Sequence, residues 1–169
     1  MTKFLAEFYI AGTPIRQPRQ RYRIVKPKGR TPFVQGYVPQ SDKVHAWKAI
    51  VKTDAQLFIR HNEMEMINFP ISIDMVFVMP RPTSRTRKTM PNDRYWHAQT
   101  PDVDNLTKAV WDALNGHLFK DDALIVKSTQ AAFVAGDGDL PGVAIRVTEA
   151  GDIGTWADGM IHEGREQLF

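Results

Sequence analysis

The stretch from residue 70 to residue 80, "PISIDMVFVMP", constrains the fold more than any other part of the chain. Its residues are mostly apolar, and Asp74 is the only charged side chain among them. An apolar run of this length is typical of a strand covered on both faces, because a strand with one face in water alternates polar and apolar residues. The sequence therefore predicts a central strand over residues 70–80.

An amphipathic helix is predicted before this strand, from Ser41 as N-cap to about His61. Its apolar residues recur at steps of three and four: Val44, Trp47, Val51, Ala55 and Phe58. Because such a stripe packs against a sheet or another helix, Trp47 is expected in the core.

A second helix is predicted after the strand, from about Asp104 to Leu114. Its stripe consists of Leu106, Val110 and Leu114, and Trp111 lies next to it and is expected in the core. The Asn115-Gly116 pair ends the helix, since glycine is the usual residue just past a helix terminus.

The remaining elements complete an α+β domain. Further strands are predicted over residues 4–12, 123–134 and 142–150, with a short one at 33–39. Four prolines and the high charge of residues 13–32 predict a loop there, and residues 81–100 predict another. The "AGDGDLPG" between the last two strands predicts a hairpin-like connection.

The predicted order is β(β)αβαββ. It indicates a small mixed sheet of four to five strands with two helices over one face. The domain is expected over residues 1–149, and residues 150–169 are expected to be an acidic C-terminal tail or arm.

Composition excludes several classes of protein. The chain has no cysteine, which excludes disulfides, zinc thiolates and cysteine nucleophiles. No apolar run approaches the roughly 20 residues of a membrane span. The sequence therefore favours a cytoplasmic protein that does not enter a membrane.

Basic residues are concentrated in two segments, although the net charge is only +3. Residues 13–41 contain seven bases and no acid, and residues 81–88 contain four more bases. Clusters of this kind are typical of proteins that bind a polyanion such as nucleic acid. The alternative is that both segments are solvated loops. The candidate DNA-binding residues are Arg16, Arg19, Arg21, Arg23, Arg85, Arg87 and Lys88.

Acidic residues gather around the second predicted helix, in "TPDVDNLTKAVWDALNGHLFKDDALI". Pro101 disfavours helix at Thr100, so Asp102 is expected before the first turn and Asp104 at or near its cap. If the chain reverses at Gly116 and returns extended, the pair Asp121-Asp122 comes back level with the first pair. Only one member of that second pair can join the cluster, because adjacent residues on a strand face opposite ways.

Three converging carboxylates repel one another unless a cation lies between them. Hard oxygen ligands favour a magnesium ion, and Lys108, one turn after Asp104, points to the same side as that acid. A lysine there can neutralise charge that develops on a phosphate. The structural alternative is a helix cap, a surface ladder of Asp104, Lys108 and Asp112, and a solvated acidic pair.

The segments "PDVDNLTKAVWDALNG" and "FKDDALI", with "IAGTPIRQPRQRYR" before them, resemble the RusA-type Holliday junction resolvases of bacteria and their phages. The resemblance covers roughly residues 4–148. It implies a magnesium-dependent homodimer that cuts branched DNA. It also implies that the metal-binding acids are Asp102, Asp104 and Asp122, and that Lys108 is the catalytic lysine.

The expected function is therefore a structure-specific endodeoxyribonuclease that resolves four-way junctions by paired cuts in recombination and repair. Its expected location is the cytoplasm of a bacterium or a phage-infected host. The alternatives are a branched-DNA-binding protein that does not cut, and a flap or fork nuclease of broader specificity. Trp96 and His97 either stack on exposed bases or pack under the loop that contains them.

Overall fold

A computed structural model describes residues 3–18, 21–37, 42–82 and 93–151. The strands are β1 (Phe4–Ala11), β2 (Arg21–Val25), β3 (Phe33–Tyr37), β4 (Ile71–Met79), β5 (Tyr95–Trp96), β6 (Ile125–Val134) and β7 (Gly142–Glu149). The helices are α1 (Asp42–His61), α2 (Val103–Leu114) and a short 3-10 helix (Asp122–Leu124). The α+β class predicted from the sequence is confirmed.

Five strands form one mixed sheet in the order β1-β7-β4-β6-β5. The predicted central strand is confirmed as β4, which pairs antiparallel with β7 on one side and parallel with β6 on the other. All but two of its nine residues are buried, as its apolar sequence requires. The strand between the two prolines therefore organises the sheet.

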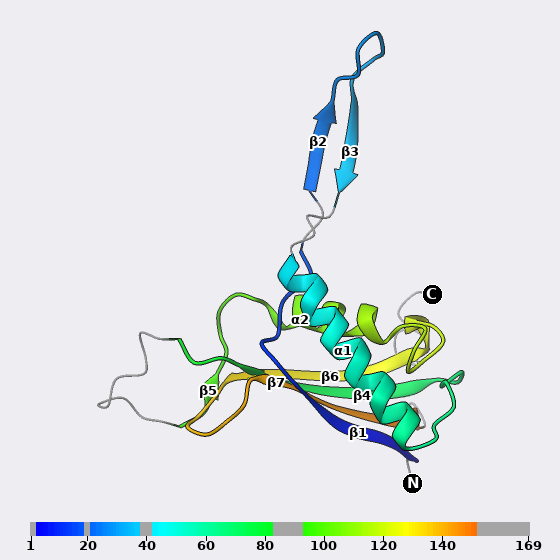
Figure 1. The fold of residues 1–169 in the computed structure, drawn as a ribbon, viewed down its shortest axis with the longest axis vertical. Coiled ribbons are helices and arrows are strands. Elements are labelled where there is room, and N and C mark those ends of the chain that lie inside the picture. Colours follow the sequence, from blue (N-terminus) through cyan, green and yellow to red (C-terminus); the bar gives the residue numbers. More distant parts are fainter. Residues whose placement is uncertain (1–2, 19–20, 38–41, 83–92, 152–169) are drawn as a thin grey trace, which may run out of the picture.

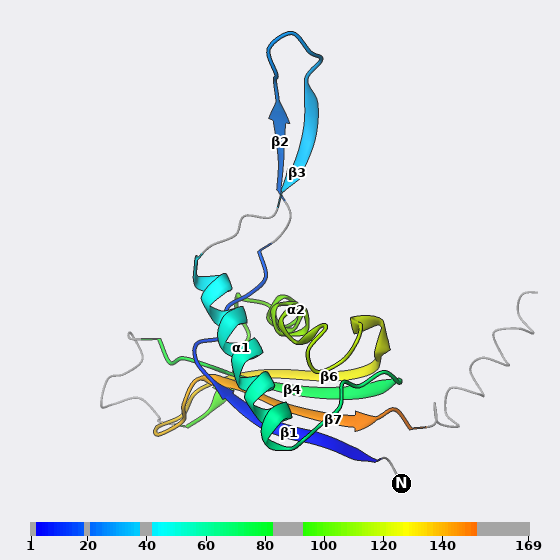
Figure 2. The ribbon, with the colours of Figure 1, turned by 45° about the vertical axis from the view of Figure 1, so that its right-hand side comes forward.

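Both helices cover the same face of this sheet (Figure 1). On that face the alternate residues Ile73, Met75 and Phe77 of β4 are buried. They belong to one core with Trp47 and Val51 of α1, and with the apolar stripe of α2. Figure 2, turned by 45°, shows α1 and α2 side by side above the strands.

The loop predicted over residues 13–32 contains strand β2, so this prediction is wrong for residues 21–25. Strand β2 pairs antiparallel with β3 and forms a separate two-stranded sheet, here called the hairpin. The prolines that disfavoured a strand lie outside it, at positions 14, 18, 27 and 32. The alternation from Arg21 to Val25 is therefore uninterrupted, and β3 supplies a pairing partner.

The hairpin-like connection predicted between the last two strands is also wrong, because β4 lies between β6 and β7. Two neighbouring strand spacings amount to only about 10 Å. The residues that join Val134 to Gly142 span that distance easily and cross the end of β4. The most apolar strand, β4, thus takes the interior position between β6 and β7. The closeness of β6 and β7 in sequence does not decide which strands pair.

The ends of the chain are described only in part. Ser41, the predicted N-cap of the first helix, lies outside the described residues. Of the tail predicted over residues 150–169, only Ala150 and Gly151 are described. Among the described residues, no helix is long and apolar enough to cross a membrane.

Candidate active site

The connection from β4 through α2 to β6 positions the acidic residues. Because β4 and β6 are parallel, the chain that connects them must return to the start of the sheet. Helix α2 makes this return, so it begins near the carboxyl end of β4. Ligand sites in sheets of parallel strands commonly lie at such carboxyl ends. The end of the sheet marked by Met79 is therefore where a site is expected, and Asp102 lies there.

Asp102 is the N-cap residue of α2, with extended backbone (φ −67°, ψ 146°). This confirms the prediction that it precedes the first turn. Its backbone carbonyl accepts from Leu106 N at 3.2 Å and so begins the helix. Its side chain makes no capping hydrogen bond. The carboxylate of Asp102 is therefore not occupied as the helix cap.

Asp104 lies in the first turn of α2, and Lys108 follows one turn later; both side chains are exposed. Residues four apart share a helix face, so the carboxylate and the ammonium group occupy the same strip of surface. The amide Nδ2 of Asn105 donates to Oδ1 of Asp104 at 3.4 Å. A carboxylate and a lysine thus stand at the helix N-terminus, where the helix dipole favours a phosphate.

Asn105 is a residue that sequence reasoning missed. It is buried, and its backbone carbonyl accepts from Gln17 N at 2.9 Å. This bond fastens the segment before the hairpin to the first turn of α2. The sequence signal for this contact was the asparagine that follows the first-turn aspartate directly. Asparagine is a weak helix former, so its presence inside a helix suggests a specific hydrogen bond.

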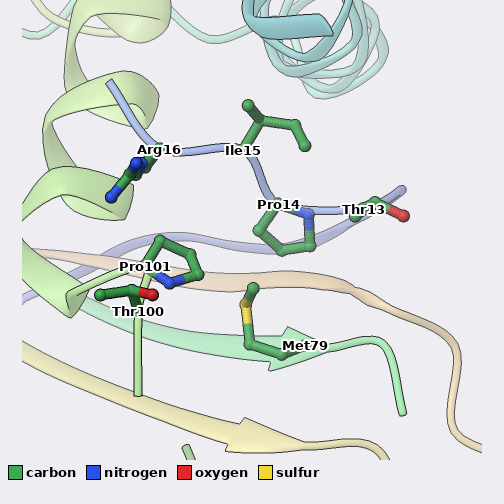
Figure 3. Close-up of a pocket in the computed structure, with 7 residues that line it drawn as sticks. All are labelled: Thr13, Pro14, Ile15, Arg16, Met79, Thr100 and Pro101. Carbon is green, nitrogen blue, oxygen red and sulfur yellow. The ribbon is translucent and has the colours of Figure 1, made fainter. Parts of the chain in front are cut away.

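An open cavity of about 420 Å³ lies at the same end of the sheet. Its lining comes from the segment after β1, the end of β4 and the residues before α2: Thr13, Pro14, Ile15, Arg16, Met79, Thr100 and Pro101. Figure 3 shows Arg16 and Pro101 on neighbouring walls, with Met79 below them. The cavity therefore places an exposed guanidinium beside the residues that lead directly into Asp102.

His97 holds the backbone before Asp102. Its Nε2 lies 3.2 Å from the carbonyl oxygen of Pro101, to which it donates, and its backbone N donates to Ala132 O at 3.0 Å. The sequence left two roles open for His97, stacking on exposed bases or packing under its loop. The structure makes it a link between β6 and the start of α2, and no spacing in the sequence signalled that contact.

Trp96 and Arg94 lie at the β5 edge of the sheet. Trp96 is 75% exposed, so its ring is not part of the described core. Arg94 forms an ion pair with Asp139 at 2.6 Å, and its guanidinium lies 5.1 Å from the Phe133 ring. The hydrogen bond from Arg94 and one from Gly136 N lower the pKa of Asp139 from 3.8 to about 2.

The second acidic pair divides into two different roles. Asp121 is the N-cap of the 3-10 helix, and its side chain accepts from Ala123 N at 2.8 Å. Asp122 begins that helix and is exposed. Asp121 therefore has a local structural role as a cap. Asp122 is exposed to solvent and does not cap the helix.

Asp122 does not lie beside Asp102 and Asp104 within one chain. It precedes β6, whose first residue pairs with Ile71, whereas Asp102 lies near Met79 at the other end of β4. The eight steps from Ile71 to Met79 separate those two ends by about 26 Å. Among the described residues, no three acidic or histidine side chains are grouped closely enough to hold a metal ion.

The predicted return of the chain is therefore wrong, for an identifiable reason. Gly116 does reverse the chain, with φ 71°, but its N–H donates to Phe119 O at 2.8 Å and closes a tight turn. Lys120 N then donates to Ile67 O at 2.9 Å, which fixes the segment beside the start of β4. The extended path back along α2 is taken by β6, after Asp122.

The predicted DNA-binding residues are only partly within the described chain. Arg16, Arg21 and Arg23 are exposed, the first beside the cavity and the other two on the hairpin. The other four, Arg19, Arg85, Arg87 and Lys88, lie outside the described residues. Arg16, Arg21 and Arg23 thus lie at the same end of the molecule as Asp102 and Asp104.

A parallel crossover that presents acids and a lysine at a helix N-terminus, flanked by arginines, is an arrangement suited to an enzyme that cleaves phosphodiesters. The comparisons with known proteins agree. The chain belongs to the family of RusA endodeoxyribonucleases, whose family model, "Endodeoxyribonuclease RusA", matches residues 11–148. The protein is thus an endodeoxyribonuclease.

A relative is known in Bacillus subtilis (strain 168). It is the uncharacterized protein YqaN, which is 29% identical over 150 residues; these cover 85% of this chain and 95% of that protein. The similarity therefore extends over most of both chains.

Proposed function

We propose that this endodeoxyribonuclease is magnesium-dependent and resolves four-way DNA junctions by paired cuts in recombination and repair. The observation that carries the proposal is the position of Asp102 and Asp104 at the exposed start of α2, beside the cavity that Arg16 lines. The family match supports action on junctions. The basic segment of residues 13–41, which includes the hairpin, supports a polyanionic substrate.

The side chains at this end fit a magnesium ion. Magnesium is usually held through one or two carboxylates, with water and substrate phosphate completing its coordination. Asp102 and Asp104, which lie just before and within the first turn of α2, supply two such carboxylates. When bound, the ion supplies positive charge that stabilises the charge developing on the phosphate.

The chain's own cations complete the electrostatic environment. Lys108 lies one turn beyond Asp104 and offers a second positive charge to the phosphate oxygens. Arg16, which lines the cavity beside the residues that lead into α2, offers a guanidinium that can hold an adjacent phosphate by two hydrogen bonds. Both groups bind the DNA backbone and orient it toward the acids.

We further propose that Asp122 serves the metal site of a second chain. In a dimer with a two-fold axis, opposite ends of the two chains lie side by side when the axis passes midway between them. Such a dimer brings Asp122 of the partner subunit to Asp102 and Asp104. A four-way junction needs two matched cuts, and two identical sites related by a two-fold axis supply them.

The dimer is tested by sedimentation at micromolar protein concentration without DNA. The expected mass is about twice the 19.2 kDa of one chain. A strict monomer that still cuts both strands of a junction in one binding event would contradict the paired mechanism. A monomer that only nicks would favour a flap or fork nuclease.

The substrate is tested by cleavage of a four-way junction, a flap and a linear duplex of equal length, each with magnesium and with EDTA. The expected result is cleavage of the junction alone, in symmetrically placed pairs, and only with magnesium. Equal cleavage of the flap would show that the enzyme acts on a broader class of branched substrates than four-way junctions. Cleavage that persists in EDTA would exclude the proposed metal.

The role of the arginines is tested by the salt dependence of binding. The double variant Arg16→Gln, Arg21→Gln should bind junction DNA more weakly and show a slope of log K against log salt that is smaller by about one per lost phosphate contact. Arg60→Gln, an exposed arginine at the far end of α1, is the control and should leave the slope unchanged. A double variant with the wild-type slope would show that both arginines are solvated.

A further inference from the structure

The hairpin formed by β2 and β3 stands apart from the rest of the protein. Within the described part of the chain its strands pair only with each other, and nine of their ten residues are exposed. Figures 1 and 2 both show it projecting away from the five-stranded sheet and the two helices. An isolated two-stranded hairpin is only marginally stable in water, so a binding partner is expected to stabilise it.

The two faces of the hairpin differ in chemistry. Directly paired residues lie on the same face, and successive residues alternate between faces. One face carries Arg21, Arg23, Gln35 and Tyr37, with Val25 and Phe33 at its outer end. The other carries Tyr22, Ile24 and Val34, which are 69%, 66% and 66% exposed. The second face is here called the apolar face.

The basic face is arranged to bind an anion. Nη2 and Nε of Arg23 donate to Oε1 of Gln35 at 2.9 and 3.2 Å, and the guanidinium lies 5.4 Å from the Tyr37 ring. Both partners are neutral, so they fix the guanidinium without cancelling its charge. Residues 13–41 contain no acid that could do so. Charge complementarity therefore identifies a nucleic acid as the occupant.

The base of the hairpin lies at the same end of the protein as the first acidic pair. Gln17, four residues before β2, is bonded to Asn105 in the first turn of α2. Four residues of chain span at most about 14 Å. A DNA molecule held at Asp104 therefore passes within reach of the hairpin.

We propose that the hairpin makes the enzyme select branched DNA, by packing Tyr22, Ile24 and Val34 against bases unstacked at the branch point while its basic face holds the backbone. In a linear duplex the faces of the bases are covered by stacking, so these side chains gain nothing there. Where strands exchange, base faces become accessible, and a base stacked on an aromatic side chain is stabilised in any sequence. This inference rests on the proposed action at junctions.

The test measures binding of a four-way junction and of a linear duplex by fluorescence anisotropy in EDTA, where no cutting interferes. The double variant Tyr22→Thr, Ile24→Thr keeps residues that favour strands, so the hairpin remains formed. Its Kd for the junction should rise about tenfold, and its Kd for the duplex by less than about twofold. Tyr22→Trp, which keeps an aromatic surface, should retain the wild-type preference.

Two controls isolate the apolar face. Leu57→Ser removes an apolar side chain that is 55% exposed on α1 and should change neither Kd. Arg23→Gln removes a charge from the basic face and should weaken junction and duplex alike, with a smaller salt slope. Thermal unfolding of the double variant should match wild type, because the hairpin contributes nothing to the core.

Several outcomes would overturn the inference. Equal losses of affinity for junction and duplex would show that the apolar face gives no selectivity, even if the enzyme still resolves junctions. Sedimentation of the double variant at half the wild-type mass would show that the face joins two copies of the chain. If the wild-type enzyme does not cut junctions but the double variant still shows the tenfold rise in junction Kd, the proposed function fails and the binding role of the hairpin stands.

Discussion

Asp104→Asn is expected to slow junction cleavage about a thousandfold or more, while junction binding in EDTA stays within about threefold of wild type. The change removes one negative charge and keeps the shape of the side chain. The loss of a favourable charge at the start of α2 costs only about 0.3–1 kcal/mol of stability, so the protein remains folded. The measurement is single-turnover cleavage of a labelled junction with a magnesium titration.

Asp112→Asn is the matched control for this variant. Asp112 lies on the same helix two turns later, is exposed, and pairs with Lys48 at 2.8 Å. The chemical change is identical, but the site lies away from the start of α2, so the cleavage rate should stay within about twofold of wild type. Asp104→Asn cutting at the rate of this control would remove Asp104 from the metal site.

The second large effect is expected from mixing two inactive variants. Asp104→Asn and Asp122→Asn should each be nearly inactive alone. If Asp122 serves the partner's site, a mixed dimer places both substitutions in one site and leaves the other intact. The mixture should therefore regain cleavage, and mixed dimers should nick one strand where wild type makes paired cuts.

The control for the mixing experiment is a mixture of two singly substituted chains, one with Asp102→Asn and the other with Asp104→Asn. These acids belong to the same half of the site, so neither site of the mixed dimer is complete and no activity should return. Asp121→Asn, which alters only the cap of the 3-10 helix, should cut at close to the wild-type rate. No recovery in the Asp104 and Asp122 mixture would contradict the sharing of sites between chains.

The sequence predicted those elements whose identity depends on local pattern. The apolar run from Ile71 to Met79 predicted the central strand, and the stripes that contain Trp47 and Leu106 predicted the two helices. The position of Asp102 before α2 followed from Pro101, because proline disfavours helical backbone at the preceding residue, Thr100, so that the helix begins only after this pair. In each case the signal and its cause lie within a few residues of chain.

What the sequence did not predict depends on partners distant in the chain. Strand β2 forms because β3 pairs with it, although prolines flank it closely. Strand β7 pairs with β4 and not with β6, its neighbour in sequence, because the most apolar strand, β4, takes the interior position between them. The separation of Asp122 from Asp104 follows from the direction of a parallel crossover, which no spacing between acids reveals.

The hydrogen bond between Gln17 and Asn105 limits the distance between the first turn of α2 and the hairpin. From that anchor the chain reaches β2 within about 14 Å, and the five residues of β2 extend about 17 Å further. One strand of duplex advances about 3.4 Å per nucleotide. A hairpin that holds the branch point therefore places the cut within about nine nucleotides of it, at an offset limited by the chain and independent of base sequence.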